Sequence, residues 1–201
     1  MIKVSKHKWI VSFFALIVLA IVAAILIVHF ATQYHYVGEL NKVLELHDYT
    51  EYDEMTYKNR VLNGQKKCFC ILSDQESQTY FGQKQKIEKS IWYNYGKCSY
   101  FASQGEASEY FSNKWSPRFD VSPGTTIENV SLRQGQKNIE IYYAIDQLET
   151  HRYAYIDLLD GKCVLELSAN LTDEESISVL LDMLEKTGCS EELQVFVNEL
   201  T

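Results

Sequence analysis

The strongest hydrophobic pattern is an uninterrupted apolar run near the N-terminus. From Trp9 to Phe30 the chain contains no Asp, Glu, Lys, Arg, Gly or Pro, and 15 of these 22 residues are Leu, Ile, Val or Phe. A helix of this length spans about 33 Å, which matches a hydrocarbon core of roughly 30 Å. A helix packed into a globular core would keep a polar face, and this run has none. The pattern therefore predicts a transmembrane helix over residues 9–30, anchored at Trp9 and Phe30.

The same run has a second interpretation, a signal peptide that is removed. Residues 22–24, Val-Ala-Ala, offer a weak small-residue cleavage site, but cleavage there leaves an apolar segment on the new N-terminus. We therefore expect an uncleaved signal anchor. The basic residues Lys3, Lys6 and Lys8 precede the run, and basic flanks stay on the cytoplasmic side. The expected location is the cell membrane, as a single-pass protein with a cytoplasmic tail over residues 1–8 and its C-terminal domain extracytoplasmic, at the cell surface.

A stalk is expected over residues 31–59, between the membrane and the outer domain. Leu40, Val43 and Leu44 recur at helical spacing, which predicts a short amphipathic helix after Gly38.

The remaining residues, 60–201, are expected to form one extracytoplasmic α+β domain. Asn63-Gly64 is typical of a tight hairpin turn, so a first hairpin is predicted there. Phe81, Ile87, Ile91 and Tyr95 could line one face of a helix, so a helix is predicted there, and residues 106–115 are expected to form another.

The C-terminal half alternates apolar and polar residues, which predicts an antiparallel meander. Thr172, with an acid three residues later, is expected to begin a helix, and a second short helix is expected from Ser190. The fold class is therefore predicted to be α+β: an N-terminal single transmembrane helix, then an antiparallel sheet (meander) covered by C-terminal helices. The expected strands are residues 97–102, 129–133, 139–145, 151–159 and 163–167.

Charge separates the two ends of the chain. The 201 residues carry a formal net charge of −8, and residues 39–201 hold all 27 acidic residues but only 16 of the 19 basic ones. An acidic domain repels phosphate backbones, so nucleic acid is not expected as a partner. The expected partners are the lipid bilayer and a protein within a membrane complex.

Five cysteines lie in the expected outer domain, where disulfides can form. They are Cys68, Cys70, Cys98, Cys163 and Cys189. The odd number leaves at least one unpaired. The first two lie two apart on one strand and share a face, so they are poor partners for each other and the other three are candidate mates. The alternative is that these residues are buried thiols. No metal or cofactor is expected.

Catalytic motifs are absent from the sequence: it contains no G-x-S-x-G, H-E-x-x-H, G-x-x-x-x-G-K-[ST] or G-x-G-x-x-G. We therefore expect a membrane-anchored, extracytoplasmic binding or accessory domain that is not an enzyme. The alternative is an exported, membrane-tethered enzyme or thiol-redox protein with a site around His151 and Cys163, which would meet across a hairpin turn. A pocket that holds these two residues would favour the enzyme, and a flat tyrosine-rich patch would favour binding.

Overall fold

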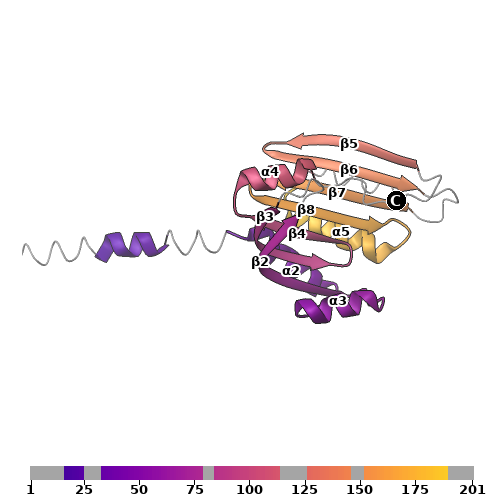
Figure 1. Ribbon diagram of the computed structural model, residues 1–201, viewed down its shortest axis with the longest axis horizontal. Coiled ribbons are helices and arrows are strands. Elements are labelled where there is room, and N and C mark those ends of the chain that lie inside the picture. The colour runs from indigo at the N-terminus through magenta and orange to yellow at the C-terminus, as the bar shows by residue number, and fades with distance from the viewer. Residues whose placement is uncertain (1–15, 25–32, 79–83, 114–125, 146–151, 190–201) are drawn as a thin grey trace, which may run out of the picture. The chain divides into compact units, whose positions relative to one another are not determined.

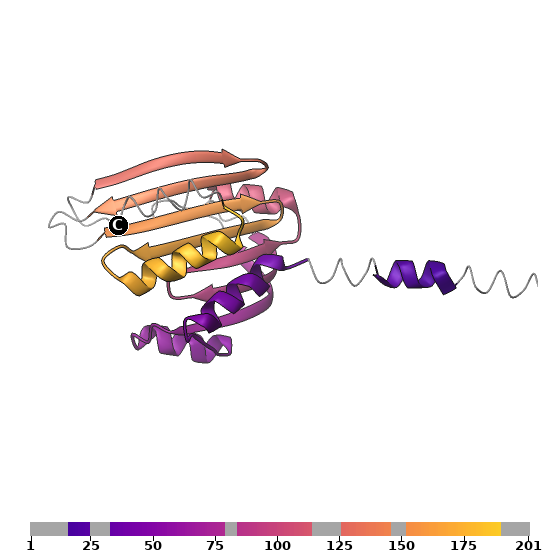
Figure 2. The same cartoon turned by 180° about the vertical axis from the view of Figure 1, so that it is seen from behind.

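The computed structural model describes residues 16–24, 33–78, 84–113, 126–145 and 152–189. The chain divides into two compact units, Met1–His35 and Tyr36–Thr201. Within the described residues, the larger unit is built on one eight-stranded sheet, shown from its two sides in Figures 1 and 2. Its elements are, in chain order, α2 (His35–Leu46), β1 (Thr50–Glu51), α3 (Glu54–Leu62), β2 (Cys68–Gln78), β3 (Lys84–Tyr93), β4 (Gly96–Phe101), α4 (Gln104–Asn113), β5 (Thr126–Gln134), β6 (Lys137–Ile145), β7 (Arg152–Asp160), β8 (Cys163–Asn170) and α5 (Glu174–Lys186).

The sheet is mixed, with the strand order β1-β2-β3-β4-β8-β7-β6-β5. The short strand β1 pairs parallel with β2, and the other neighbouring strands are antiparallel. The predicted fold class, a purely antiparallel sheet after a transmembrane helix, is therefore wrong. The parallel pair arises because α3 carries the chain from β1 back to the same end of the sheet before β2 begins, a crossover that two-residue turns cannot make.

Helices lie on both faces of the sheet. Figure 2 shows α2 and α5 across one face, and Figure 1 shows α4 on the opposite face. On α5, the buried side chains Val179, Leu180, Met183 and Leu184 recur at helical spacing and cover the sheet. The predicted cover by C-terminal helices alone is thus corrected, because α2, from the N-terminal part of the chain, covers the same face.

The membrane predictions are also corrected. Among the described residues, no helix is long and apolar enough to cross a membrane. This finding overturns the transmembrane helix over residues 9–30, the single-pass signal anchor and the cell-membrane location with an extracytoplasmic, surface-exposed domain. The anchor residues Trp9 and Phe30 lie outside the described residues.

Asn63-Gly64 ends a helix instead of joining two strands. Asp53 caps α3 by accepting a hydrogen bond from the Thr56 amide at 3.0 Å, and the helix stops at Leu62. Gly64 then adopts a φ of +78°. A left-handed residue is needed both in a tight hairpin and after a helix C-terminus, so the dipeptide alone did not distinguish the two.

Ile87 and Ile91 lie on a strand and not on the predicted helix. The ladder between β3 and β4 shifts register between Ile87 and Lys89, which marks a β-bulge. Because of this extra residue, Ile87 packs in the cluster under α4, while Ile91 lies opposite Cys98. The four-residue spacing thus reflects a bulge and not a helical turn.

Other predicted elements are confirmed. The amphipathic helix in the predicted stalk is α2, in which Leu40, Val43 and Leu44 are buried. Strands β5, β6, β7 and β8 form consecutive antiparallel pairs. The C-terminal helix begins one residue later than predicted, because Asp173 caps α5 and Thr172 bonds to Asn170 instead. The helix predicted from Ser190 lies outside the described residues.

Candidate functional site

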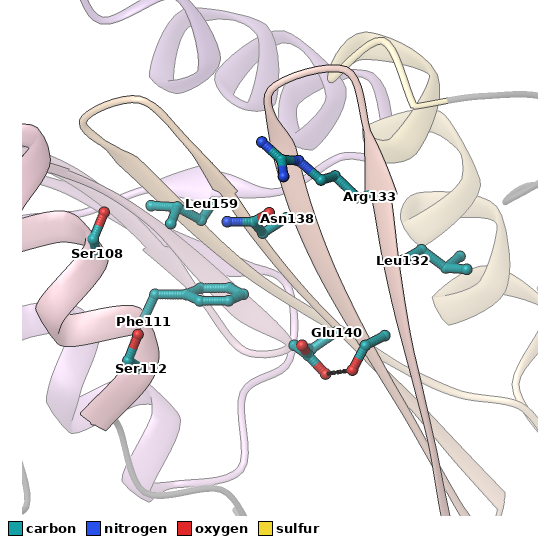
Figure 3. Close-up of a pocket in the computed structure, with 9 residues that line it drawn as sticks. Ser108, Phe111, Ser112, Leu132, Arg133, Asn138, Glu140 and Leu159 are labelled. Atoms are coloured by element: carbon teal, nitrogen blue, oxygen red, sulfur yellow. Dashed lines mark hydrogen bonds between the residues drawn. The ribbon is translucent and has the colours of Figure 1, made fainter.

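A groove lies between α4 and the strands β5 and β6 (Figure 3). Its volume is about 400 Å³ and it is open to solvent. We call it the α4–β6 groove. Its lining residues are Ser108, Phe111, Ser112, Ser131, Leu132, Arg133, Asn138, Glu140 and Leu159.

The helix α4 forms one wall of the groove. Its first turn is capped by Ser103, which accepts a hydrogen bond from the Glu106 amide and donates one to the Glu106 carboxylate, both at 3.2 Å. Ala107 and Tyr110 are buried in the cluster against the sheet. Because this side of the helix is fixed, its other side presents Ser112 to the groove, as Figure 3 shows.

The β5–β6 hairpin forms the other wall. Arg133 lies opposite Asn138 in the ladder, and Ser131 lies opposite Glu140. Gly135 turns the chain with a φ of +60°. Cross-strand pairs share a face of the sheet, so these four side chains lie on the side of the sheet that α4 covers. The Ser131 hydroxyl donates a 2.6 Å hydrogen bond to the Glu140 carboxylate, which orients that acid (Figure 3).

Several polar side chains of the groove have no side-chain partner among the described residues. Within the part of the chain that the structure describes, Arg133, Asn138, Ser108 and Ser112 make no side-chain hydrogen bond or ion pair. The guanidinium of Arg133 carries five N–H donors and a full positive charge. The groove therefore offers a cation, an amide and two hydroxyls, beside the ring of Phe111, to a molecule that enters it.

A charged network beneath α4 fixes that helix to the sheet. The Lys97 ammonium lies 2.9 Å from the Glu166 carboxylate, whose side chain is only 4% exposed. Lys97 also donates to the Tyr110 hydroxyl at 2.7 Å, and Tyr110 donates to Glu166 at 3.1 Å. In the ladder, Glu166 lies opposite Asp157, and Asp157 opposite Glu140. A polar row therefore crosses the sheet from this network to the floor of the groove.

The catalytic alternative, His151 with Cys163, stays a prediction that the described residues do not test. His151 lies outside the described residues. Cys163 is 1% exposed on the face that α2 covers, and its Sγ lies 3.3 Å from the Sγ of Cys98. Burial and the contact with Cys98 raise the pKa of the Cys163 thiol well above its usual range. Because a thiolate is the reactive form, this environment disfavours nucleophilic chemistry at Cys163.

All five cysteines are free and buried in this structure. Burial raises the pKa of the Cys70 thiol to about 12 and also raises those of Cys68 and Cys189. The possible disulfides stay a prediction. Among the five cysteines, Cys98 and Cys163 lie in contact with each other. No cluster of three or more His, Cys, Asp or Glu side chains suited to a metal ion occurs among the described residues.

Sequence reasoning did not select any residue of the groove as a candidate site. The periodicity predicted a helix over residues 106–115, of which 106–113 lie in α4 and 114–115 lie outside the described residues. It also predicted strands over residues 129–133 and 139–145, which lie in β5 and β6, so these elements carry the groove residues. It contained no signal that this helix would pack beside this hairpin, because α4 follows β4, and β8 and β7 lie between β4 and β6 in the sheet. The predicted partners, the lipid bilayer and a protein of a membrane complex, stay predictions that the described residues do not test.

Comparison with known proteins gave no matching family model, no matching curated protein and no matching solved structure.

Proposed function

We propose that the chain is a binding domain that takes a polypeptide segment of a partner protein in the α4–β6 groove. The observation that carries this proposal is the groove itself, with Arg133 and Asn138, which have no side-chain partner among the described residues, on one wall and Phe111 on the other. A polar groove with an aromatic side chain and an exposed arginine has the composition of many protein-binding surfaces, in which aromatic residues and arginine contribute most of the affinity.

The groove is better suited to a polypeptide than to a small cofactor. Small-molecule sites enclose most of the ligand surface and are lined mainly by apolar side chains. Here the groove is open, and six of its nine lining residues are polar or charged. None of the nine is a histidine or a cysteine, which supports binding in preference to nucleophilic catalysis at this place.

Peptide selection followed by groove blocking tests the proposal. Peptides selected from a random displayed library against the full chain are measured by fluorescence polarisation on the wild type and on Ser112→Trp. The tryptophan fills the groove from α4, so we expect affinity to fall by about tenfold or more, since steric exclusion removes most contacts of a bound segment.

The matched control is Ser178→Trp, which places the same ring on an exposed position of α5. Affinity for the control should stay within about twofold of the wild type, because surface substitutions away from a contact have little effect. Selection of no binding peptide, or equal weakening by the two tryptophans, would contradict the proposal.

A further inference from the structure

The two edges of the described sheet differ in length and in protection. At one edge, β1 has only two residues, Thr50 and Glu51. At the other, β5 has nine residues that pair with β6 without a break in register. Natural edge strands are usually blunted by short length, proline, lysine or a bulge, because their outward N–H and C=O groups can pair with another chain. The strand β5 has none of these features, so its backbone can accept a further strand.

The apolar side chains of β5 are also only partly buried. On the face that α2 and α5 cover, Ile139 and Ile141 of β6 are each 1% exposed, whereas their cross-strand neighbours Leu132 and Val130 are 44% and 38% exposed. The apolar layer therefore continues onto β5, where these two side chains are only partly covered. On the other face, the exposed Arg133 lacks an acidic partner among the described residues.

We propose that β5 binds an extended polypeptide segment as an additional strand, and that an acidic residue of this segment pairs with Arg133. This inference rests on the proposed function and names the chemistry of its partner. The segment alternates apolar and acidic residues: the apolar ones cover Val130 and Leu132, and the acidic ones lie on the groove side. Strand addition of this kind takes affinity from main-chain hydrogen bonds and specificity from alternate side chains.

A second copy of this chain fits the edge less well than a different partner. If β5 strands of two copies pair antiparallel about a two-fold axis, directly opposed side chains lie on the same face of the sheet. Arg133 of one copy then lies opposite an odd-numbered position of β5 in the other copy. These positions hold Ile127, Asn129, Ser131 and Arg133, none of which is acidic. Self-pairing therefore leaves the arginine without a counter-charge, whereas an acidic segment supplies one.

The test uses the synthetic peptide Val-Glu-Val-Glu-Val-Glu-Val, labelled with a fluorophore, and the full-length chain. The peptide should bind, and amide hydrogen exchange over residues 126–134 should slow by about tenfold while that of β1 is unchanged, because only β5 gains hydrogen bonds. Two further versions of the peptide carry N-methyl groups on alternate residues: one on the valines and the other on the glutamates. One of the two methylated forms should lose about tenfold or more in affinity, since it keeps every side chain but cannot donate to β5.

Charge exchange tests the role of Arg133. Arg133→Gln should lower the affinity for the glutamate peptide by about five- to tenfold, since it removes a charge-assisted contact. Arg133→Glu should reverse the preference in favour of the peptide with lysine in place of glutamate. The control is Lys58→Gln, which removes the same charge from α3 and should change the affinity by less than about twofold.

The outcomes separate this inference from the function on which it rests. Equal affinity of the parent and both methylated peptides would overturn strand addition. If, in that case, Ser112→Trp still abolishes binding of the alternating peptide, the groove remains the binding site. If library peptides occupy the groove but the alternating peptide does not bind, the proposed partner chemistry is wrong and the proposed function stands. A dimer in sedimentation with slowed exchange at β5 would overturn the inference in favour of self-pairing.

Discussion

At the scale of single residues, the network of Lys97, Tyr110 and Glu166 decides how α4 sits on the sheet. Lys97 contacts both partners, and the Glu166 side chain is 4% exposed. A buried carboxylate is costly unless its charge is balanced and its oxygens are hydrogen-bonded. The network meets this requirement, and because Tyr110 belongs to α4, it also holds one wall of the groove.

Removal of the cation should therefore destabilise the protein. We expect Lys97→Met to lower the free energy of unfolding by about 2–4 kcal/mol, because it leaves the buried Glu166 carboxylate without its cation. Loss of one partner of a fully buried ion pair costs somewhat more, but Lys97 itself is partly exposed. The double variant Lys97→Met/Glu166→Gln should recover about half of the loss. Urea denaturation measures both. Lys58→Met, which breaks an exposed ion pair, is the control and should cost about 0.5 kcal/mol or less. Equal losses in the single and double variants would show that the charge balance is unimportant.

The buried thiols should be inert in the folded protein. Cys68, Cys70, Cys163 and Cys189 are buried and have raised pKa values, so few thiolates form at neutral pH and reagents do not reach them. We expect N-ethylmaleimide at pH 7.5 to leave all five cysteines unmodified on the minute timescale and to modify all five in guanidinium chloride. Mass spectrometry of intact protein counts the adducts. Fast native modification of a single cysteine would instead support the thiol-redox alternative.

At the scale of elements, α2 is held by its apolar stripe. Five of its side chains are buried, and Leu40 and Leu44 are 0% exposed. The backbone amide of Tyr36 donates a 2.9 Å hydrogen bond to the Tyr100 hydroxyl of β4, which fixes the start of the helix on the sheet. The helix thus completes the layer that covers one face, although the sequence places it in the predicted stalk.

Two leucines of α2 provide a matched test of this role. Leu40→Ala should lower the free energy of unfolding by about 2–5 kcal/mol, because it opens a cavity in the core. Leu46 lies on the same helix but is 74% exposed, so Leu46→Ala should change stability by less than about 0.5 kcal/mol. Urea denaturation followed by circular dichroism measures both. Equal effects of the two substitutions would show that α2 is not packed on the sheet.

At the scale of the whole molecule, the buried phenols and thiols link stability to alkaline pH. Burial raises the pKa values of Tyr36, Tyr49, Tyr57 and Tyr100, and raises that of Cys70 to about 12. Each of these groups is neutral in the folded chain at a pH at which it already ionises in the unfolded chain. The folded state therefore binds more protons than the unfolded state in this range.

Stability should consequently fall as the pH rises above about 8.5, where unfolded cysteines and then tyrosines begin to ionise. Below that pH these groups are neutral in both states and contribute the full stability. We expect the urea midpoint to be similar at pH 7 and 8, lower at pH 9.5 and lower again at pH 10.5. Tyr57→Phe should reduce the slope between the last two values. A midpoint that does not change up to pH 10.5 would contradict the inferred burial.

The period-two alternation of β5 to β8 and the apolar stripes of α2 and α5 could be recognised from the chain alone, because each signal lies within one element or one short turn. Three features depended on distant residues. The bulge at residue 88 decided that Ile87 and Ile91 lie on opposite faces, α3 decided that β1 runs parallel to β2, and packing against the sheet placed α4 beside the β5–β6 hairpin. Such pairings are set by the total area buried and by the satisfaction of polar groups across the whole sheet, which no local spacing encodes. The groove and the open edge at β5 therefore exist only in the assembled fold.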